Sequence, residues 1–190
     1  MMKRKQILVL VIAGVVAMVL GAIAGRYTAR YFEKQEAAER QAASAIARPE
    51  TLPPFTLYDM NGEPVTTEQL LAHDKALFIN FWATWCRPCR EEMPLLTKMQ
   101  EKYKDRLLMV GIAIDNKEAV AEFLEHIGGV NYPILLGEQE LDAIETANAM
   151  GVDLIGLPIS ITTDKAGKIV EIHTGEVDEA EATALIEAVL

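Results

Sequence analysis

The chain has 190 residues, 51% of them hydrophobic, and a formal net charge of −10. The charge is uneven, because residues 1–49 carry a net +5 and residues 50–190 a net −15. An acidic domain lacks the basic face that binding to a phosphate backbone needs, so we expect no nucleic-acid partner. The length beyond the N-terminal segments suffices for one domain with its own core.

The N-terminal segment favours a membrane anchor. Basic residues at 3–5 precede nineteen uncharged residues at 7–25, a length that spans a bilayer core as a helix. This run exceeds the usual apolar core of a signal peptide. We therefore expect residues 1–26 to be a single-pass anchor in the cytoplasmic membrane, with the N-terminus inside and the C-terminal domain extracytoplasmic. A cleaved signal peptide, with its site at 22–24, is the alternative.

Residues 27–49 are predicted to form a helical linker. They are rich in Ala, Glu, Arg and Gln, and Glu36 and Arg40 stand four residues apart, where they support a solvated helix. Pro49 ends the pattern, because proline does not continue a helix. We expect this segment to lift the following domain from the membrane surface.

Residues 50–190 alternate segments typical of strands and of helices. Long apolar runs at 75–83 and 107–114 predict buried strands, and Asn116 predicts the N-cap of the helix that follows the second run. In chain order we expect strands at 55–58 and 64–66, a helical turn at 67–71, a strand at 75–83, a helix at 86–104, a strand at 107–114, a helix at 117–127, a strand at 134–136, a helix at 140–150, a hairpin of 159–163 with 169–174, and a last helix after Asp178. This order predicts an α/β fold with a mixed sheet flanked by helices.

The only two cysteines of the chain lie between a predicted strand and a predicted helix, in Trp85-Cys86-Arg87-Pro88-Cys89. A Cys-x-x-Cys pair at such a turn indicates redox chemistry. Cys86 falls at the helix N-terminus, where free N–H groups and the helix dipole stabilise a thiolate. Cys89 follows one turn later, close enough to close a disulfide.

Each residue of the motif has a predicted role. Cys86 is the expected attacking thiol, and Cys89 the thiol that resolves the mixed disulfide. The charge of Arg87 favours the Cys86 thiolate, although an ordinary solvated arginine is the equal alternative. Pro88 fixes the backbone at the helix start, where no N–H is needed.

Two interpretations of the cysteine pair without redox chemistry are weaker. A structural disulfide across so short a loop would restrain the unfolded chain little. A zinc site would need two more ligands, and His73, His126 and His173 are scattered without ligand spacing.

The segment from Asn80 to Pro94 resembles the active-site segment of the membrane-anchored TlpA/ResA-type branch of the thioredoxin superfamily. Gly156-Leu157-Pro158 is similar to the cis-proline segment of that family, and the resemblance covers about residues 50–190. It implies a thioredoxin-like fold and a thiol–disulfide oxidoreductase that needs no cofactor beyond its own disulfide. It further implies reduction of protein disulfides in exported proteins such as apocytochrome c, with electrons from a membrane thiol donor.

The resemblance also implies roles for residues around the motif. Glu92 would lie near the active site and help handle protons, the alternative being a surface acid on the helix. Asn80 stands where cytoplasmic thioredoxins carry a buried aspartate, so it either leaves proton transfer to Glu92 or only satisfies buried hydrogen bonds.

Two features would shape the surface that meets substrate. The bond between Leu157 and Pro158 would be cis and would present the Leu157 backbone to a substrate strand; the alternative is a plain trans turn. Trp85 would shield the disulfide and form part of the docking surface, whereas Trp82 belongs to the core.

Two other activities use the same cysteines. A Cu(I) metallochaperone is the alternative function, because soft thiolates suit Cu(I), although no third ligand is nearby. A thiol peroxidase is disfavoured because no Thr-x-x-Cys pattern is present. The direction of electron flow stays open, since the reduction potential depends on details of the site.

Overall fold

The computed structural model describes residues 49–190. The predicted anchor at 1–26, and the linker at 27–49 except for Pro49, lie outside the described residues. Between residues 49 and 190, no helix has both the length and the apolar character needed to cross a bilayer.

Strands and helices follow in nearly the predicted order and bounds. They are β1 (Thr56–Asp59), β2 (Pro64–Thr66), α2 (Thr67–Leu71), β3 (Ala76–Trp82), α3 (Arg87–Tyr103), β4 (Leu107–Ala113), α4 (Lys117–Ile127), β5 (Ile134–Leu136), α5 (Glu140–Ala149), β6 (Ile159–Thr163), β7 (Ile169–Thr174) and α6 (Glu179–Glu187).

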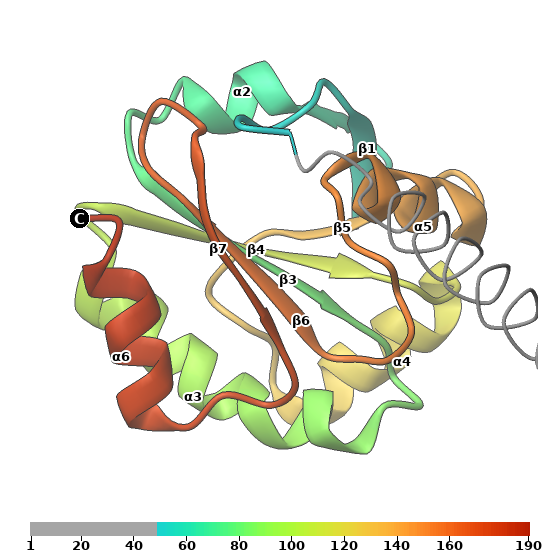
Figure 1. Ribbon diagram of the computed structural model, residues 1–190. Coiled ribbons are helices and arrows are strands. Elements are labelled where there is room, and N and C mark those ends of the chain that lie inside the picture. Colours follow the sequence, from blue (N-terminus) through green and yellow to red (C-terminus); the bar gives the residue numbers. More distant parts are fainter. Residues whose placement is uncertain (1–48) are drawn as a thin grey trace, which may run out of the picture. The chain divides into compact units, whose positions relative to one another are not determined.

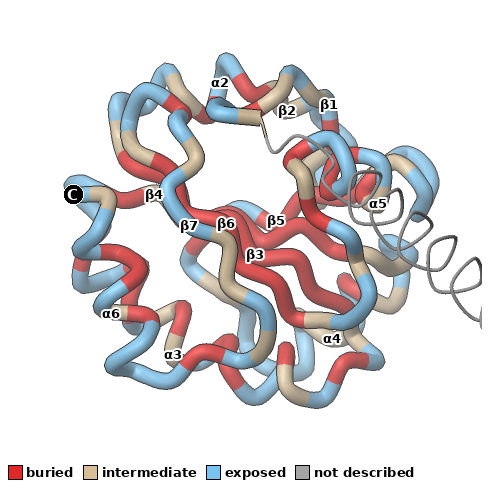
Figure 2. The backbone as a smooth tube through the Cα atoms, viewed as in Figure 1, coloured by how far each residue is buried: buried red, intermediate tan, exposed pale blue. Residues whose placement is uncertain are grey.

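The strands form one mixed sheet in the order β2-β1-β5-β4-β3-β6-β7 (Figure 1). β3 pairs in parallel with β4, and β4 with β5, while the remaining neighbours are antiparallel. β3 therefore lies inside the sheet, with β4 on one side and β6 on the other. All seven of its residues are buried, and the strand is red along its length in Figure 2.

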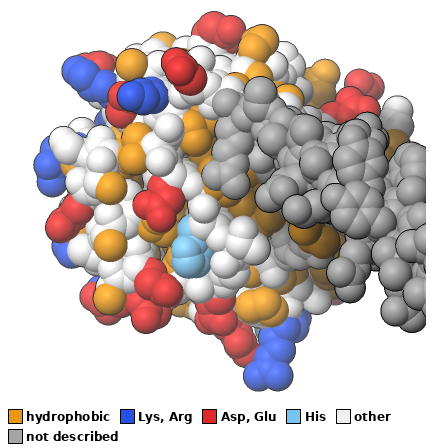
Figure 3. Space-filling model, viewed as in Figure 1, with side chains coloured by type: hydrophobic (Ala, Val, Ile, Leu, Met, Phe, Trp, Pro, Cys, Tyr) orange, Lys and Arg blue, Asp and Glu red, His pale blue; other side chains and the backbone are white. Residues whose placement is uncertain are grey.

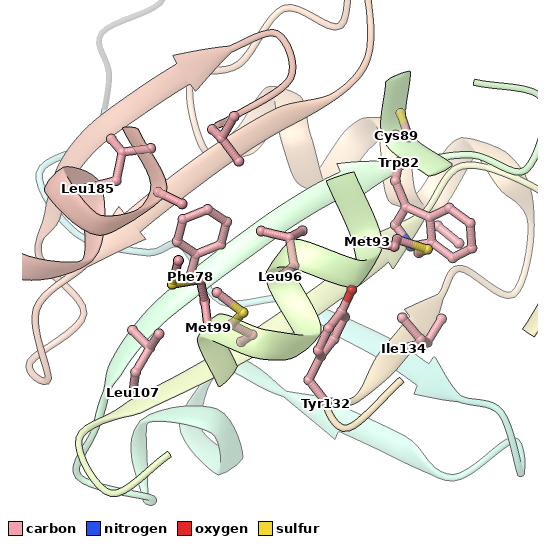
Figure 4. Packing of buried hydrophobic residues seen from close by; sticks show 14 of the residues in the cluster. Phe78, Trp82, Cys89, Met93, Leu96, Met99, Leu107, Tyr132, Ile134 and Leu185 are labelled. Carbon is pink, nitrogen blue, oxygen red and sulfur yellow. The ribbon is translucent and has the colours of Figure 1, made fainter. Parts of the chain in front are cut away.

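Alternation along β3 divides the core into two layers. Leu77, Ile79 and Phe81 pack in the layer that includes buried residues of α2 and α5. Phe78 and Trp82 pack in the opposite layer with α3, α4 and α6, part of which Figure 4 shows. Helices cover both faces, so the predicted α/β fold is confirmed.

Side-chain caps explain where two helices begin. Asn116 accepts a hydrogen bond from the Ala119 N–H at 2.9 Å, which starts α4 at the predicted residue. The same helix ends at Gly128, whose φ of 81° is accessible to glycine without steric cost. Asp178 caps α6 by accepting from two N–H groups of its first turn.

The pairing of β3 with β6 places the two halves of the functional site together. Phe81 at the end of β3 lies opposite Ile159 at the start of β6, so the loop after β3 and the segment before β6 lie side by side. The first loop carries the cysteine motif, and the second carries Pro158. Acidic side chains are spread over the visible face of the domain, as its net charge predicts (Figure 3).

Candidate functional site

The cysteines form a disulfide at the N-terminus of α3. Cys86 is the N-cap residue, and its Sγ accepts a hydrogen bond from the Cys89 N–H at 3.3 Å. The two Cα atoms are 5.3 Å apart. Cys86 is 5% exposed and Cys89 is fully buried, so Cys86 is the more accessible of the two. The helix position suits a thiolate at Cys86, and the attacking and resolving roles stay predictions.

Arg87 and Pro88 occupy the first turn of α3, as predicted. The Arg87 side chain is exposed and donates from Nε to Glu91 Oε1 at 2.8 Å. This hydrogen bond and the charge of Glu91 raise the pKa of Arg87. This pairing was not predicted from the sequence, and it offsets part of the positive field that Arg87 would direct at Cys86.

Glu92 is a buried carboxyl, so its interpretation as a surface acid is wrong. Only 1% of the residue is exposed. Asn80 Nδ2 donates to Oε1 at 2.9 Å, and the Val177 N–H donates to Oε2 at 3.0 Å. Burial raises the pKa of Glu92 to about 7, against the lowering effect of these two bonds, and the charge of Glu176 adds to the rise.

A carboxyl with a pKa near neutrality exchanges protons readily at physiological pH. Glu92 follows Cys89 by three residues, which places both on one side of the helix, and both are buried in the layer between α3 and the sheet. The proton-handling role of Glu92 stays a prediction, and its location supports it.

Asn80 satisfies buried hydrogen bonds, as one of its two interpretations predicts. Its Nδ2 donates to Ser160 Oγ at 3.2 Å as well as to Glu92. Asn80 and Ser160 are direct partners across β3 and β6, so the sheet itself sets their spacing. An amide neither gains nor loses a proton in the neutral range, which leaves Glu92 as the titratable member of this group.

The Leu157–Pro158 peptide bond is cis, as predicted. Pro158 is buried, and its carbonyl accepts a hydrogen bond from the Gly175 N–H at 2.9 Å. Leu157 is half-buried, and Ile155 just before it is 90% exposed. In the described part of the chain, no backbone hydrogen bond involves Leu157, which leaves its N–H and C=O for an incoming strand.

The two tryptophans have different surroundings. Trp82 is fully buried, and its ring centroid lies 5.6 Å from that of Phe123 on α4, which confirms its place in the core. Trp85 is 69% exposed beside the cysteines. Its proposed docking role stays a prediction that this exposure favours.

Two hydrogen bonds that were not predicted from the sequence hold the loop between β3 and α3. The N–H and the hydroxyl of Thr84 both donate to Asp115 Oδ2, just before α4. No spacing rule signals this contact, because the two residues are 31 positions apart on different loops. It fixes the backbone that leads into Cys86.

The described residues contain no group of three or more His, Cys, Asp or Glu side chains placed to hold a metal ion. Cys86 and Cys89 are paired with each other. The Cys86–Cys89 pair can undergo reversible thiol–disulfide exchange.

A mixed sheet, a Cys-x-x-Cys disulfide at a helix N-terminus and a neighbouring cis-proline define a thioredoxin-like thiol–disulfide oxidoreductase. A solved structure supports the class: the thioredoxin-family thiol:disulfide interchange protein of Chlorobium tepidum TLS matches with a TM-score of 0.63. The two sequences are 28% identical, and the match covers 76% of this chain and 99% of the Chlorobium chain.

The Redoxin family matches residues 48–190, and the chain belongs to this family. The chain is 31% identical over 141 residues to thiol-disulfide oxidoreductase ResA of Bacillus subtilis (strain 168), covering 72% of each chain. It is 27% identical over 173 residues to the thioredoxin-like protein YneN of the same organism, covering 90% of this chain and 92% of YneN. The protein is thus an oxidoreductase of the ResA and thioredoxin type, whose redox group is its own disulfide.

Proposed function

We propose that the protein is a membrane-tethered, extracytoplasmic oxidoreductase that reduces disulfides in exported proteins, apocytochrome c among them. The disulfide at the start of α3, with the buried Glu92 carboxyl one turn behind it, carries this proposal. The apolar run at 7–25 favours the tether, and the resemblance of residues 80–94 to the active-site segment of the TlpA/ResA-type branch favours the reducing direction.

The first half of the reaction starts from the reduced pair. The Cys86 thiolate attacks one sulfur of a substrate disulfide, the substrate S–S bond breaks, and the other substrate sulfur leaves as a thiolate. The product is a mixed disulfide between Cys86 and the substrate. The helix N-terminus favours the thiolate that begins this step.

The second half releases the substrate. The Cys89 thiol gives its proton to the Glu92 carboxylate, and the resulting thiolate attacks Cys86 Sγ. The mixed disulfide breaks, the second substrate thiolate departs and takes up a proton, and the Cys86–Cys89 bond closes. The substrate gains two electrons and the enzyme loses two.

A membrane thiol donor then returns two electrons to the Cys86–Cys89 disulfide. During each exchange the substrate segment lies beside Leu157, where pairing with the free backbone groups would hold it as an added strand. The exposed side chains of Trp85, next to Cys86, and of Ile155, two residues before Leu157, would contact the substrate side chains.

The reduction potential of the couple tests the reducing direction. The full chain, in detergent micelles, is equilibrated with thiol buffers, and the oxidised fraction is measured. A potential near that of thioredoxin, about −270 mV, is expected of a reductant. A potential near about −120 mV would overturn the proposal and assign an oxidant that introduces disulfides.

Membrane location is tested separately in cells that express the full chain. The domain is expected to sediment with membranes, and to be digested by a protease added to cells whose outer layers have been opened. Recovery of an intact domain in the soluble fraction, or its protection from the protease, would contradict the proposed topology.

A further inference from the structure

The core layer between the sheet and α3 also holds polar atoms that make no hydrogen bond. Trp82 Nε1 and the Tyr132 hydroxyl are both buried, and neither has a hydrogen-bond partner among the described residues. A donor left unpaired in a core lowers stability, so the donors of Trp82 and Tyr132 call for an explanation.

A glycine makes room for both donors. Gly111 on β4 is the direct partner of Asn80 on β3, the residue that donates to Glu92. A Cβ at position 111 would lie 3.1 Å from Trp82 Nε1 and 3.4 Å from Tyr132 Cε2. The two aromatic rings therefore pack over the backbone of Gly111, next to the residue that holds the carboxyl.

The Tyr132 ring is directed at α3. In Figure 4 its hydroxyl end points toward the part of the helix that carries Leu96 and Met93, the second of which follows Glu92 directly. Burial and the charge of Glu92 both raise the pKa of Tyr132, so this hydroxyl keeps its proton and remains a donor.

Glu92 has unused capacity to accept hydrogen bonds. An ionised carboxylate offers about four acceptor positions, and Asn80 and Val177 occupy two. Three titratable groups surround Glu92. Glu176 opposes its ionisation through its own charge, and the Tyr132 hydroxyl is neutral. The third is His173 on β7, which pairs with Ser160 on β6. Tyr132 is the neutral donor in this set.

We propose that Tyr132 is a positioning residue for proton transfer at Glu92, because its hydroxyl dipole stabilises the carboxylate whenever Glu92 ionises in the core. A protonated Glu92 carries no charge and gains little from this dipole, so the effect favours the form that receives a proton. The link to Cys89 rests on the proposed function, in which Glu92 takes the proton of that thiol.

The test is a titration of Glu92 itself. The full chain in detergent micelles, with the disulfide closed, carries ¹³C at the glutamate side-chain carboxyls, and Glu92→Gln identifies the Glu92 signal by its loss. In Tyr132→Phe the midpoint of that signal is expected to rise by about half a pH unit or more. An unchanged midpoint would overturn the proposal and leave Tyr132 a packing residue.

Tyr103→Phe is the matched control. Tyr103 belongs to the same core layer, but its hydroxyl donates to Glu187 at 3.2 Å. The same chemical change there is expected to leave the Glu92 midpoint in place, and an equal shift in both variants would contradict a specific role for Tyr132.

A kinetic measurement adds a second readout. The pH profile for resolution of the mixed disulfide is expected to move upward by the same half unit in Tyr132→Phe, which lowers the rate about threefold on the acidic side of the midpoint. An unmoved profile would contradict the link to Cys89. If the unaltered chain exchanges no disulfide at all, the proposed function fails, while the titration still decides the role of Tyr132.

Discussion

The Val177 N–H donates to Glu92 Oε2 at 3.0 Å, across 85 positions of sequence. This bond joins the first half of α3 to the turn that precedes α6. Glu92 is thus held by two hydrogen bonds, one from Asn80 on β3 and one from the turn before α6. Because both bonds end on this carboxyl, its protonation state is linked to the stability of the domain.

The stability of the domain should fall as pH rises through the titration of Glu92. The folded chain keeps this proton up to a pKa of about 7, whereas the ordinary value for glutamate is 4.5. Between pH 4.5 and pH 7 the folded state therefore binds more protons than the unfolded state. As the pH rises through this range, Glu92 lowers the free energy of unfolding by about 3 kcal/mol in total.

Denaturant unfolding from pH 4 to pH 8 checks this, with Glu92→Gln as the variant. Glutamine can accept from Val177 and donate to a rotated Asn80 amide, so the variant should fold and should lose the Glu92 contribution to the pH dependence. Glu91→Gln, at an exposed neighbouring position, is the control. Parallel curves for Glu92→Gln and the unaltered chain would show that Glu92 does not titrate in this range.

Cysteine variants should divide the two chemical roles. Cys89→Ser removes the resolving thiol, so mixed disulfides with substrate should accumulate and be visible on non-reducing gels. Cys86→Ser removes the attacking thiol and should form none. Trapping by Cys86→Ser alone would reverse the assignment.

Glu92→Gln should slow resolution more than attack. The amide cannot take the Cys89 proton, and loss of a general base typically lowers a rate about 100-fold or more. Stopped-flow measurement of each half-reaction near neutral pH separates the steps, with Glu91→Gln as the matched change on the same helix. Equal rates for Glu92→Gln and the unaltered chain would remove Glu92 from the mechanism.

The Arg87–Glu91 pair should tune the attacking thiol modestly. Glu91→Gln frees the charge of Arg87 and should increase the thiolate fraction of the reduced Cys86 side chain at neutral pH, whereas Arg87→Gln should decrease it. The ultraviolet absorbance of the thiolate, followed against pH, reports both. Shifts of the same sign in the two variants would contradict the proposed offset.

Gly111→Ala should destabilise the core. The added Cβ would lie 2.6 Å from Ile134 Cδ1 and 3.1 Å from Trp82 Nε1, and such overpacking typically costs about 1–3 kcal/mol. Gly156→Ala is the control, because a Cβ there meets nothing within 4 Å. The denaturant midpoints of the two variants are compared. Equal midpoints would show that the sheet accommodates a methyl group at position 111 without loss of stability.

Much of the fold could be predicted because the local signals agree with one another. The bounds of α4 follow from Asn116 at one end and Gly128 at the other, and the apolar run of β3 marks a strand buried on both faces. The cysteine motif was equally visible, because its chemistry depends on residues close together in sequence.

The surroundings of the motif could not be predicted in the same way. Helical spacing places Glu92 on the side of Cys89, but its buried surroundings include Val177, which follows the last strand of the sheet in the sequence. The position of Tyr132 over Gly111 likewise depends on how β4 and β5 pair. Such contacts arise from tertiary packing and leave no periodicity in one sequence.

Asp115 gives the active-site loop a fixed connection to α4. Because both bonds from Thr84 end on one of its oxygens, the segment entering Cys86 and the segment entering α4 are coupled through a single carboxylate. A substitution that moves this carboxylate would therefore disturb both segments at once, the backbone two residues before Cys86 and the start of α4.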